Sequence, residues 1–187
     1  MEYKTLNNGL KMPMVGLGVY NISERETQRV VEDAISVGYR SIDTAAMYYN
    51  EKGVGDAVRA CGVPREELFV TTKICDSCYT KEETMRTVDH SMKQLGLDYV
   101  DLMLIHWPVG NPTVIWHTLE ELYKQGMFKA IGVSNFYPKM IENINLFDFT
   151  LTDEDLREIR LFDTGRNVTG WPSDALNYNP EVGSSNY

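Results

Sequence analysis

The sequence predicts an α/β protein in which helices cover a parallel sheet. Short apolar segments alternate with amphipathic segments at intervals of about 30 residues, which is the length of a strand–helix–strand unit. Five apolar segments, which we predict to be strands, and four amphipathic segments, which we predict to be helices, occur before residue 138. A (β/α)₈ barrel and a doubly wound sheet both begin with this pattern, so periodicity alone leaves the choice between them open.

A hairpin is expected first, over residues 6–15, because Asn7, Asn8 and Gly9 supply a turn between apolar positions. The predicted strands follow at 14–18, 40–43, 68–73, 99–105 and 128–133. Each helix between them carries one apolar stripe and ends at a glycine, namely Gly38, Gly62, Gly96 and Gly126. Capping boxes are predicted where two of the helices begin, over residues 23–26 and 80–83.

The rhythm of strands and helices breaks after Pro138. Residues 140–149 form one apolar-rich stretch, and residues 152–162 are expected to form a short helix. The last segment, 165–187, is rich in glycine, proline, asparagine and serine without periodicity, which predicts an extended tail.

Composition excludes several classes of partner. The 187 residues include 18 basic and 27 acidic side chains, and the net charge of −9 disfavours binding to nucleic acid or to an anionic membrane surface. No run of 18 apolar residues is present, and the first residues lack the apolar core of a secretion signal. With only three cysteines, the chain is expected to be cytoplasmic. Cys75 and Cys78 lack a second ligand pair, so no metal site is expected.

Four polar residues fall at or just beyond the carboxyl ends of predicted strands. They are Asp43, Tyr48, Lys73 and His106. In parallel α/β proteins this edge of the sheet binds ligands and carries the chemistry. Charged groups are costly to bury alone, so we expect the aspartate and the lysine to meet each other or a ligand.

A tyrosine beside a lysine and a histidine can act as an acid. A neighbouring ammonium group favours the phenolate, and the phenol can then donate its proton to a developing alkoxide. In this interpretation Asp43 holds Lys73, and Tyr48 is the acid. The alternative is a structural ion pair between Asp43 and Lys73, with Tyr48 serving only to pack.

Four motifs closely resemble those of the aldo-keto reductase family. They are GYRSIDTAAMYYNE at 38–51, FVTTK at 69–73, LGLDYVDLMLIHWP at 95–108 and IGVSNF at 131–136. They occur in the family's order and at similar spacing. The resemblance covers residues 4–138 and resumes over 140–164.

The resemblance implies a (β/α)₈ barrel of the TIM type that reduces aldehydes or ketones with NADPH. It implies that Tyr48 donates the proton, that Asp43 and Lys73 support it, and that His106 orients the carbonyl group. The residues implied to bind the cofactor are Gly18, Asp43, Ser134 and Asn135. Those implied to line the pocket for a small carbonyl substrate are Tyr20, Met47 and Trp107.

The sequence departs from the family after Pro138. Family members continue through three more strand–helix units, whereas here residues 142–152 resemble the segment that follows the eighth strand. We therefore expect an incomplete barrel over 1–164, with five units in 4–138, a remnant of the family's C-terminal end in 140–164, and a tail over 165–187. The alternative function is that of an inactive, internally truncated remnant, acting at most as a binding or oligomerising module through open sheet edges.

Overall fold

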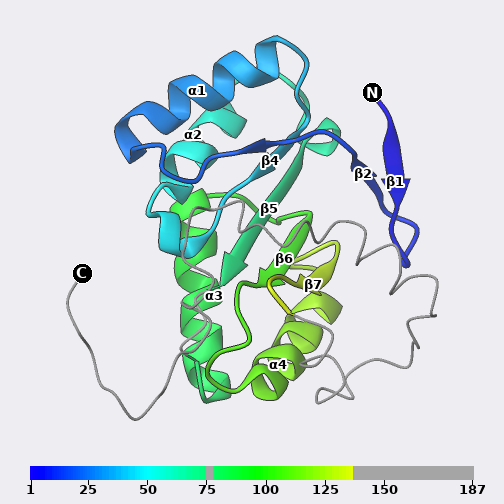
Figure 1. Ribbon diagram of the computed structural model, residues 1–187, viewed down its shortest axis with the longest axis vertical. Helices are drawn as coiled ribbons and strands as arrows, with labels where there is room; N and C mark the ends of the chain where they lie inside the picture. The colour runs from blue at the N-terminus through cyan, green and yellow to red at the C-terminus, as the bar shows by residue number, and fades with distance from the viewer. Residues whose placement is uncertain (75–77, 137–187) are drawn as a thin grey trace, which may run out of the picture. The chain divides into compact units, whose positions relative to one another are not determined.

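The computed structural model describes residues 1–74 and 78–136, and Figure 1 shows their arrangement. The strands are β1 (Tyr3–Thr5), β2 (Lys11–Pro13), β3 (Leu17–Gly18), β4 (Ser41–Asp43), β5 (Phe69–Ile74), β6 (Leu102–Ile105) and β7 (Ile131–Val133). The helices are α1 (Glu24–Ser36), α2 (Glu51–Ala60), α3 (Lys81–Leu95) and α4 (Pro112–Lys124), with short 3₁₀ turns η1 (Ala46–Tyr48) and η2 (Arg65–Glu67). The expected helix at 152–162, the tail and the boundary after residue 164 lie outside the described residues.

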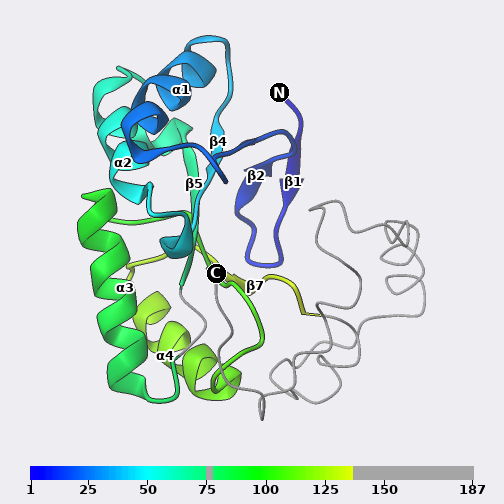
Figure 2. The ribbon, with the colours of Figure 1, turned by 60° about the vertical axis from the view of Figure 1, so that its left-hand side comes forward.

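Five of the strands form one parallel sheet in the order β3-β4-β5-β6-β7. A doubly wound sheet reverses its strand order and carries helices on both faces. Here the order follows the sequence without reversal, and α1 to α4 all lie on the same side of the sheet (Figure 2). The described part of the chain is therefore an incomplete (β/α)₈ barrel of the TIM type, which confirms the prediction and resolves the choice that periodicity left open.

The core lies between the sheet and the helices. Every residue of the central strand β5 is buried. The register places Ile42 beside Val70, and Ile74 beside Ile105, all of them buried under the helices. Helices α2 and α3 approach closely at Gly55, where a Cβ atom would lie 1.7 Å from the carbonyl oxygen of Leu95. None of the helices within residues 1–74 and 78–136 has the length and apolar character needed to cross a membrane.

The N-terminal hairpin is confirmed, but its strands lie further toward the N-terminus than predicted. Strands β1 and β2 pair antiparallel around a turn in which Gly9 has a φ of +86°. The first strand begins at Tyr3 rather than at Leu6 because the pairing extends over Tyr3–Thr5. The side-chain amide of Asn8 donates a hydrogen bond to the carbonyl oxygen of Lys129 at 2.8 Å, which fixes the hairpin to the segment that leads into β7.

One of the two predicted capping boxes forms. At α3 the backbone N–H of Glu83 donates to Thr80 Oγ1 at 3.2 Å, and the backbone N–H of Thr80 donates to Glu83 Oε2 at 3.0 Å. At α1 the prediction is wrong, because the hydroxyl of Ser23 donates directly to the carboxylate of Glu26 at 3.0 Å and does not cap the backbone.

Candidate active site

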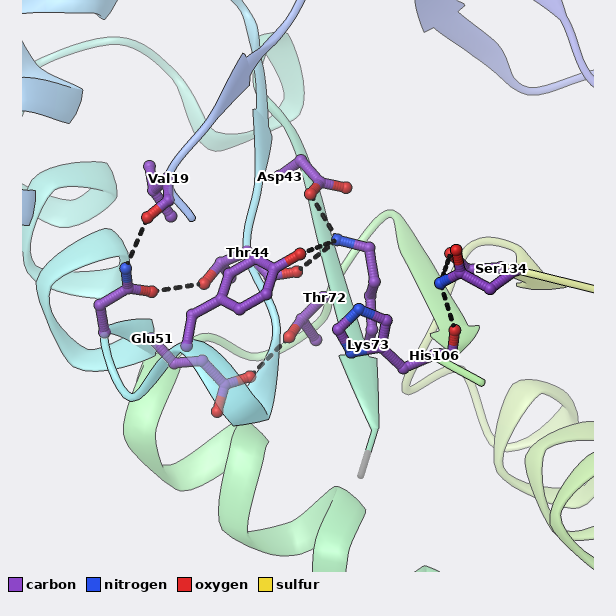
Figure 3. A network of polar contacts seen from close by, with 11 residues as sticks. Val19, Asp43, Thr44, Glu51, Thr72, Lys73, His106 and Ser134 are labelled. Atoms are coloured by element: carbon purple, nitrogen blue, oxygen red, sulfur yellow. Dashed lines mark hydrogen bonds and ion pairs between the residues drawn. The ribbon is translucent and has the colours of Figure 1, made fainter. Parts of the chain in front are cut away.

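The four polar residues predicted from strand ends lie together in the structure. Asp43 ends β4, Lys73 lies near the end of β5, and His106 follows β6 directly. Tyr48 reaches the same place from η1, the short turn that follows β4. Figure 3 shows the side chains of Asp43, Lys73 and His106 converging at the carboxyl edge of the sheet.

Lys73 is at the centre of this group and is only 7% exposed. Its ammonium group forms an ion pair with Asp43 Oδ1 and donates a hydrogen bond to the carbonyl oxygen of Thr44 at 3.0 Å. Its third contact is the hydroxyl of Tyr48, at 3.4 Å. The buried positive charge is thus balanced by one carboxylate, and it lies against a phenol that is only partly buried.

Aromatic rings surround the phenol. The ring centroid of Tyr48 lies 5.0 Å from that of Tyr20 and 5.7 Å from that of His106, the latter in an edge-on arrangement. The ring of Trp107 stacks on His106 at 6.1 Å. Of the three residues implied to contact substrate, Tyr20 and Trp107 therefore flank Tyr48 and His106. Met47 lies beside Tyr48 in η1 with its side chain exposed.

The residues implied to bind the cofactor lie at the same edge of the sheet. Asn135 follows β7 with a φ of +59°, and its side-chain amide donates to the carbonyl oxygen of His106 at 2.8 Å and to Ser134 Oγ at 3.1 Å. Gly18 ends β3, the strand next to β4, and it pairs there with Asp43. A Cβ atom on Gly18 would meet nothing within 4 Å. Open space therefore lies beside the aspartate.

A second set of polar residues supports the segment that carries Tyr48. The side chain of Asn50 is fully buried; it accepts a hydrogen bond from Thr44 Oγ1 at 2.8 Å and donates to the carbonyl oxygens of Val19 and Ile22 at 2.9 and 3.0 Å. Sequence reasoning missed this role. The position of Asn50 just before an amphipathic helix is typical of an exposed N-cap, so the sequence gives no sign of burial.

Glu51 is the other residue of this set. Its side chain is nearly buried and accepts a hydrogen bond from Thr72 Oγ1 at 2.6 Å. Burial raises the pKa of the Glu51 carboxyl, and the hydrogen bond from Thr72 opposes this effect in part. A carboxylate in the first turn of a helix is normally favoured by the helix dipole while exposed to solvent, so no local pattern indicates that this one is buried.

Within residues 1–74 and 78–136, no three His, Cys, Asp or Glu side chains lie close enough together to hold a metal ion. Cys78 is buried, and Cys75 lies outside the described residues.

An incomplete (β/α)₈ scaffold with a tyrosine, a lysine, an aspartate and a histidine at its carboxyl edge belongs to a recognisable class of proteins. The sequence model of the Aldo/keto reductase family matches residues 13–157. The chain belongs to the aldo/keto reductase family.

Named relatives support this assignment. The chain is 49% identical over 146 residues to the uncharacterized oxidoreductase YtbE of Bacillus subtilis, a match that covers 75% of this chain and 52% of the relative. It is 47% identical over 141 residues to the glyoxal reductase of Bacillus subtilis, covering 74% of this chain and 51% of that protein. The chain thus spans about half the length of these curated relatives.

Solved structures agree with the fold. An aldo/keto reductase from Brucella melitensis matches with a TM-score of 0.77 and 37% identity, over 85% of this chain and 68% of that one. The aldo-keto reductase of Bombyx mori, solved in complex with NADP, matches with a TM-score of 0.73 and 34% identity, over 79% of this chain and 55% of that one.

Proposed function

We propose that this chain reduces small aldehydes or ketones to alcohols with NADPH, with Tyr48 as the proton donor. The observation that carries the proposal is the position of the Lys73 ammonium group, which lies between the carboxylate of Asp43 and the hydroxyl of Tyr48. A structural ion pair alone does not require a partly buried phenol as the third partner of a buried lysine.

The residues at the edge of the sheet fit one end of the cofactor. Ser134 and Asn135 present polar groups beside His106, and the open space at Gly18 leaves room for a bound group next to Asp43. We assign these four residues (Gly18, Asp43, Ser134 and Asn135) to cofactor binding. NADPH, when bound, supplies the hydride that the carbonyl carbon accepts.

The protein groups manage the proton. Tyr48 donates its hydroxyl proton to the carbonyl oxygen as negative charge develops there. Lys73 stabilises the phenolate that remains, and Asp43 holds the ammonium group in place. His106, which faces the edge of the Tyr48 ring, orients the carbonyl group by hydrogen bonding to its oxygen.

The substrate would lie against an aromatic wall. We assign Tyr20, Met47 and Trp107 to this wall because two of them flank the acid and the third is exposed next to it. Aromatic faces bind the apolar part of a substrate while a few polar groups fix its orientation. A small carbonyl compound with an apolar substituent therefore suits the site.

The proposal is tested by turnover and by cofactor binding in the same protein. Tyr48→Phe should lower the rate of carbonyl reduction by at least about 100-fold because the proton donor is lost. It should leave the affinity for NADPH, followed by cofactor fluorescence, nearly unchanged. The matched control is Tyr79→Phe, since Tyr79 is exposed and is not among the residues assigned to the site. A Tyr48→Phe protein as fast as the parent would show that the assignment of the acid is wrong.

One observation favours a second candidate, an inactive remnant that acts as a binding or oligomerising module. Within the described part of the chain β7 pairs with β6 on one edge only, and an open strand edge is a template for pairing with another chain. This candidate predicts no fluorescence change on NADPH addition up to millimolar concentration, together with a solution mass above that of a monomer. A monomer that binds NADPH at micromolar concentration would exclude it.

A further inference from the structure

Glu51 is a buried carboxyl group that the proposed mechanism does not use. It is 3% exposed, at the first residue of α2, and its hydrogen bond from Thr72 Oγ1 measures 2.6 Å. Placing an ionisable group in the interior is costly, and an apolar side chain of similar size often does the same packing at a lower cost. A buried glutamate at this position therefore calls for a role other than filling space.

The bond between Glu51 and Thr72 connects the same two segments as the contact between Tyr48 and Lys73. Glu51 follows Tyr48 by three residues, and Thr72 directly precedes Lys73. Successive residues of a strand point to opposite faces, so the two contacts lie on opposite sides of β5. Figure 3 shows the Glu51–Thr72 bond and the Lys73–Asp43 ion pair as two separate contacts of β5.

The turn between these two contacts, at Tyr49 and Asn50, has a backbone conformation that requires support from its surroundings. Tyr49 has a φ of +56°, which is strained for a residue with a side chain, and that side chain is 83% exposed, so little packing restrains it. Asn50 anchors one side of the turn through its bonds to Val19 and Ile22. These bonds run toward the end of β3, whereas the bond from Thr72 to Glu51 ties the other side of the turn to β5.

The contact that depends on this turn is sensitive to small movements. The distance of 3.4 Å from Lys73 Nζ to the Tyr48 hydroxyl is already at the long end for a hydrogen bond. A shift of α2 relative to β5 by a few tenths of an ångström would break it. We propose that Glu51 is a positioning residue for the proton donor, and that its hydrogen bond to Thr72 holds the Tyr48 hydroxyl against the Lys73 ammonium group. This inference rests on the proposed reductase function.

The test removes the hydrogen bond between Thr72 and Glu51 by substituting either the donor or the acceptor. Thr72→Val keeps the shape of the side chain but has no hydroxyl, and Glu51→Met keeps the length but has no acceptor. Glu51→Gln retains an acceptor oxygen and is the conservative variant. The matched control is Thr118→Val, because Thr118 is equally buried and its hydroxyl bonds only within α4, to the carbonyl oxygen of Val114 at 2.8 Å. Circular dichroism and thermal unfolding establish that each variant is folded.

Two measurements follow. In steady-state reduction with saturating NADPH, Thr72→Val and Glu51→Met should lower kcat by about 10- to 100-fold with little change in KM, because misplacement of a reacting group by 1 Å costs about 100-fold. Glu51→Gln should lie closer to the parent than to Glu51→Met. Without cofactor or substrate, acylation of Lys73 followed by mass spectrometry, relative to exposed Lys93, should become several-fold faster in Thr72→Val as Tyr48 moves away.

The labelling measurement separates this inference from the proposed function. A parent that reduces no carbonyl compound refutes the reductase proposal, while faster labelling of Lys73 in Thr72→Val would still support the positioning role. Lys73 labelling in Thr72→Val that equals the labelling in Thr118→Val overturns the inference, whatever the turnover of the parent. If Thr72→Val does not fold, the comparison of Glu51→Met with Glu51→Gln decides the outcome by the same criterion.

Discussion

The carboxylate of Asp101 accepts a hydrogen bond from the guanidinium group of Arg65 at 2.7 Å, although Asp101 is only 3% exposed. The same oxygen accepts a hydrogen bond from the backbone N–H of Val70 at 2.9 Å, and the other carboxylate oxygen lies 3.7 Å from Lys129 Nζ. Arg65 precedes β5, Asp101 precedes β6 and Lys129 precedes β7. One buried carboxylate thus fixes the amino ends of three neighbouring strands.

Removal of the Asp101 carboxylate should destabilise the fold strongly. Asp101→Ala is expected to lower the free energy of unfolding by about 3 kcal/mol, because the largely buried guanidinium group of Arg65 loses its charged partner and the backbone N–H of Val70 loses a hydrogen-bond acceptor. Urea denaturation measures the loss. Asp98→Ala is the control, since Asp98 is exposed, and it should change stability by no more than about 0.5 kcal/mol. Equal losses in the two variants would contradict the role given to Asp101.

The strained turn at Tyr49 offers a stabilising substitution. Glycine adopts a positive φ without steric penalty, so Tyr49→Gly should raise the free energy of unfolding by about 1 kcal/mol. Tyr79→Gly tests the explanation, because Tyr79 is also exposed but is not among the residues with a positive φ. There the added freedom of the unfolded chain should lower stability. If both variants changed the free energy of unfolding in the same direction, the explanation by backbone strain at Tyr49 would be wrong.

Glu51 should make stability depend on pH in an unusual direction. Burial raises the pKa of Glu51 above its ordinary value of 4.5, so the folded protein binds this proton more tightly than the unfolded chain does. The resulting stability is fully present below pH 4.5 and is lost as pH rises through the pKa of the folded state. Glu51→Gln should therefore become more stable relative to the parent on going from acidic to neutral pH. Denaturant unfolding at the two pH values gives the comparison.

Glu83 is the control, because the pH dependence of stability that it contributes should have the opposite sign. Hydrogen bonds from the backbone N–H groups of Tyr79 and Thr80 lower the pKa of the Glu83 carboxyl. Its contribution to stability is present above pH 4.5 and is lost as pH falls through the pKa of the folded state. Glu83→Gln should then be less stable than the parent near neutral pH, with the difference shrinking in acid. A pH dependence of equal sign for the two glutamine variants would be inconsistent with these environments.

Close packing of α2 against α3 predicts a severe effect of one methyl group. In Gly55→Ala the new Cβ atom would overlap the backbone carbonyl oxygen of Leu95, and backbone cannot rotate away as a side chain can. We expect a loss of at least about 3 kcal/mol, at the upper end for overpacking. Arg59→Ala, also in α2 but half-exposed, should cost much less. A Gly55→Ala protein as stable as the parent would mean that the two helices separate easily.

Much of the sheet could be predicted because its strands are short apolar runs followed by polar residues. The pattern around Ile42 and Asp43 or around Val70 and Lys73 marks both a buried strand and its carboxyl end. The limits of the strands were less predictable. The predicted strand at 128–133 begins only at Ile131, because Phe128 makes an isolated bridge with Val100 and not a continuous ladder.

The parts of the site that lie outside regular periodicity could not be predicted from local pattern. Tyr48 reaches the site from a three-residue 3₁₀ turn, which carries no periodic signal, so its nearness to Lys73 rests on tertiary contacts. Glu51 and Asp101 are charged residues whose local sequence is compatible with solvent exposure. Their burial depends on partners at positions 72 and 65, and no local pattern links residues so far apart.

The hydrogen bond from Asn8 to Lys129 joins positions 121 residues apart. During synthesis at about 5–20 residues per second, the hairpin leaves the ribosome roughly 6 to 24 s before its anchor does. An isolated two-stranded hairpin is marginally stable in water, so β1 and β2 gain this support only after Lys129 has been made. This hydrogen bond therefore contributes to the stability of the finished fold and not to the early steps by which the hairpin forms.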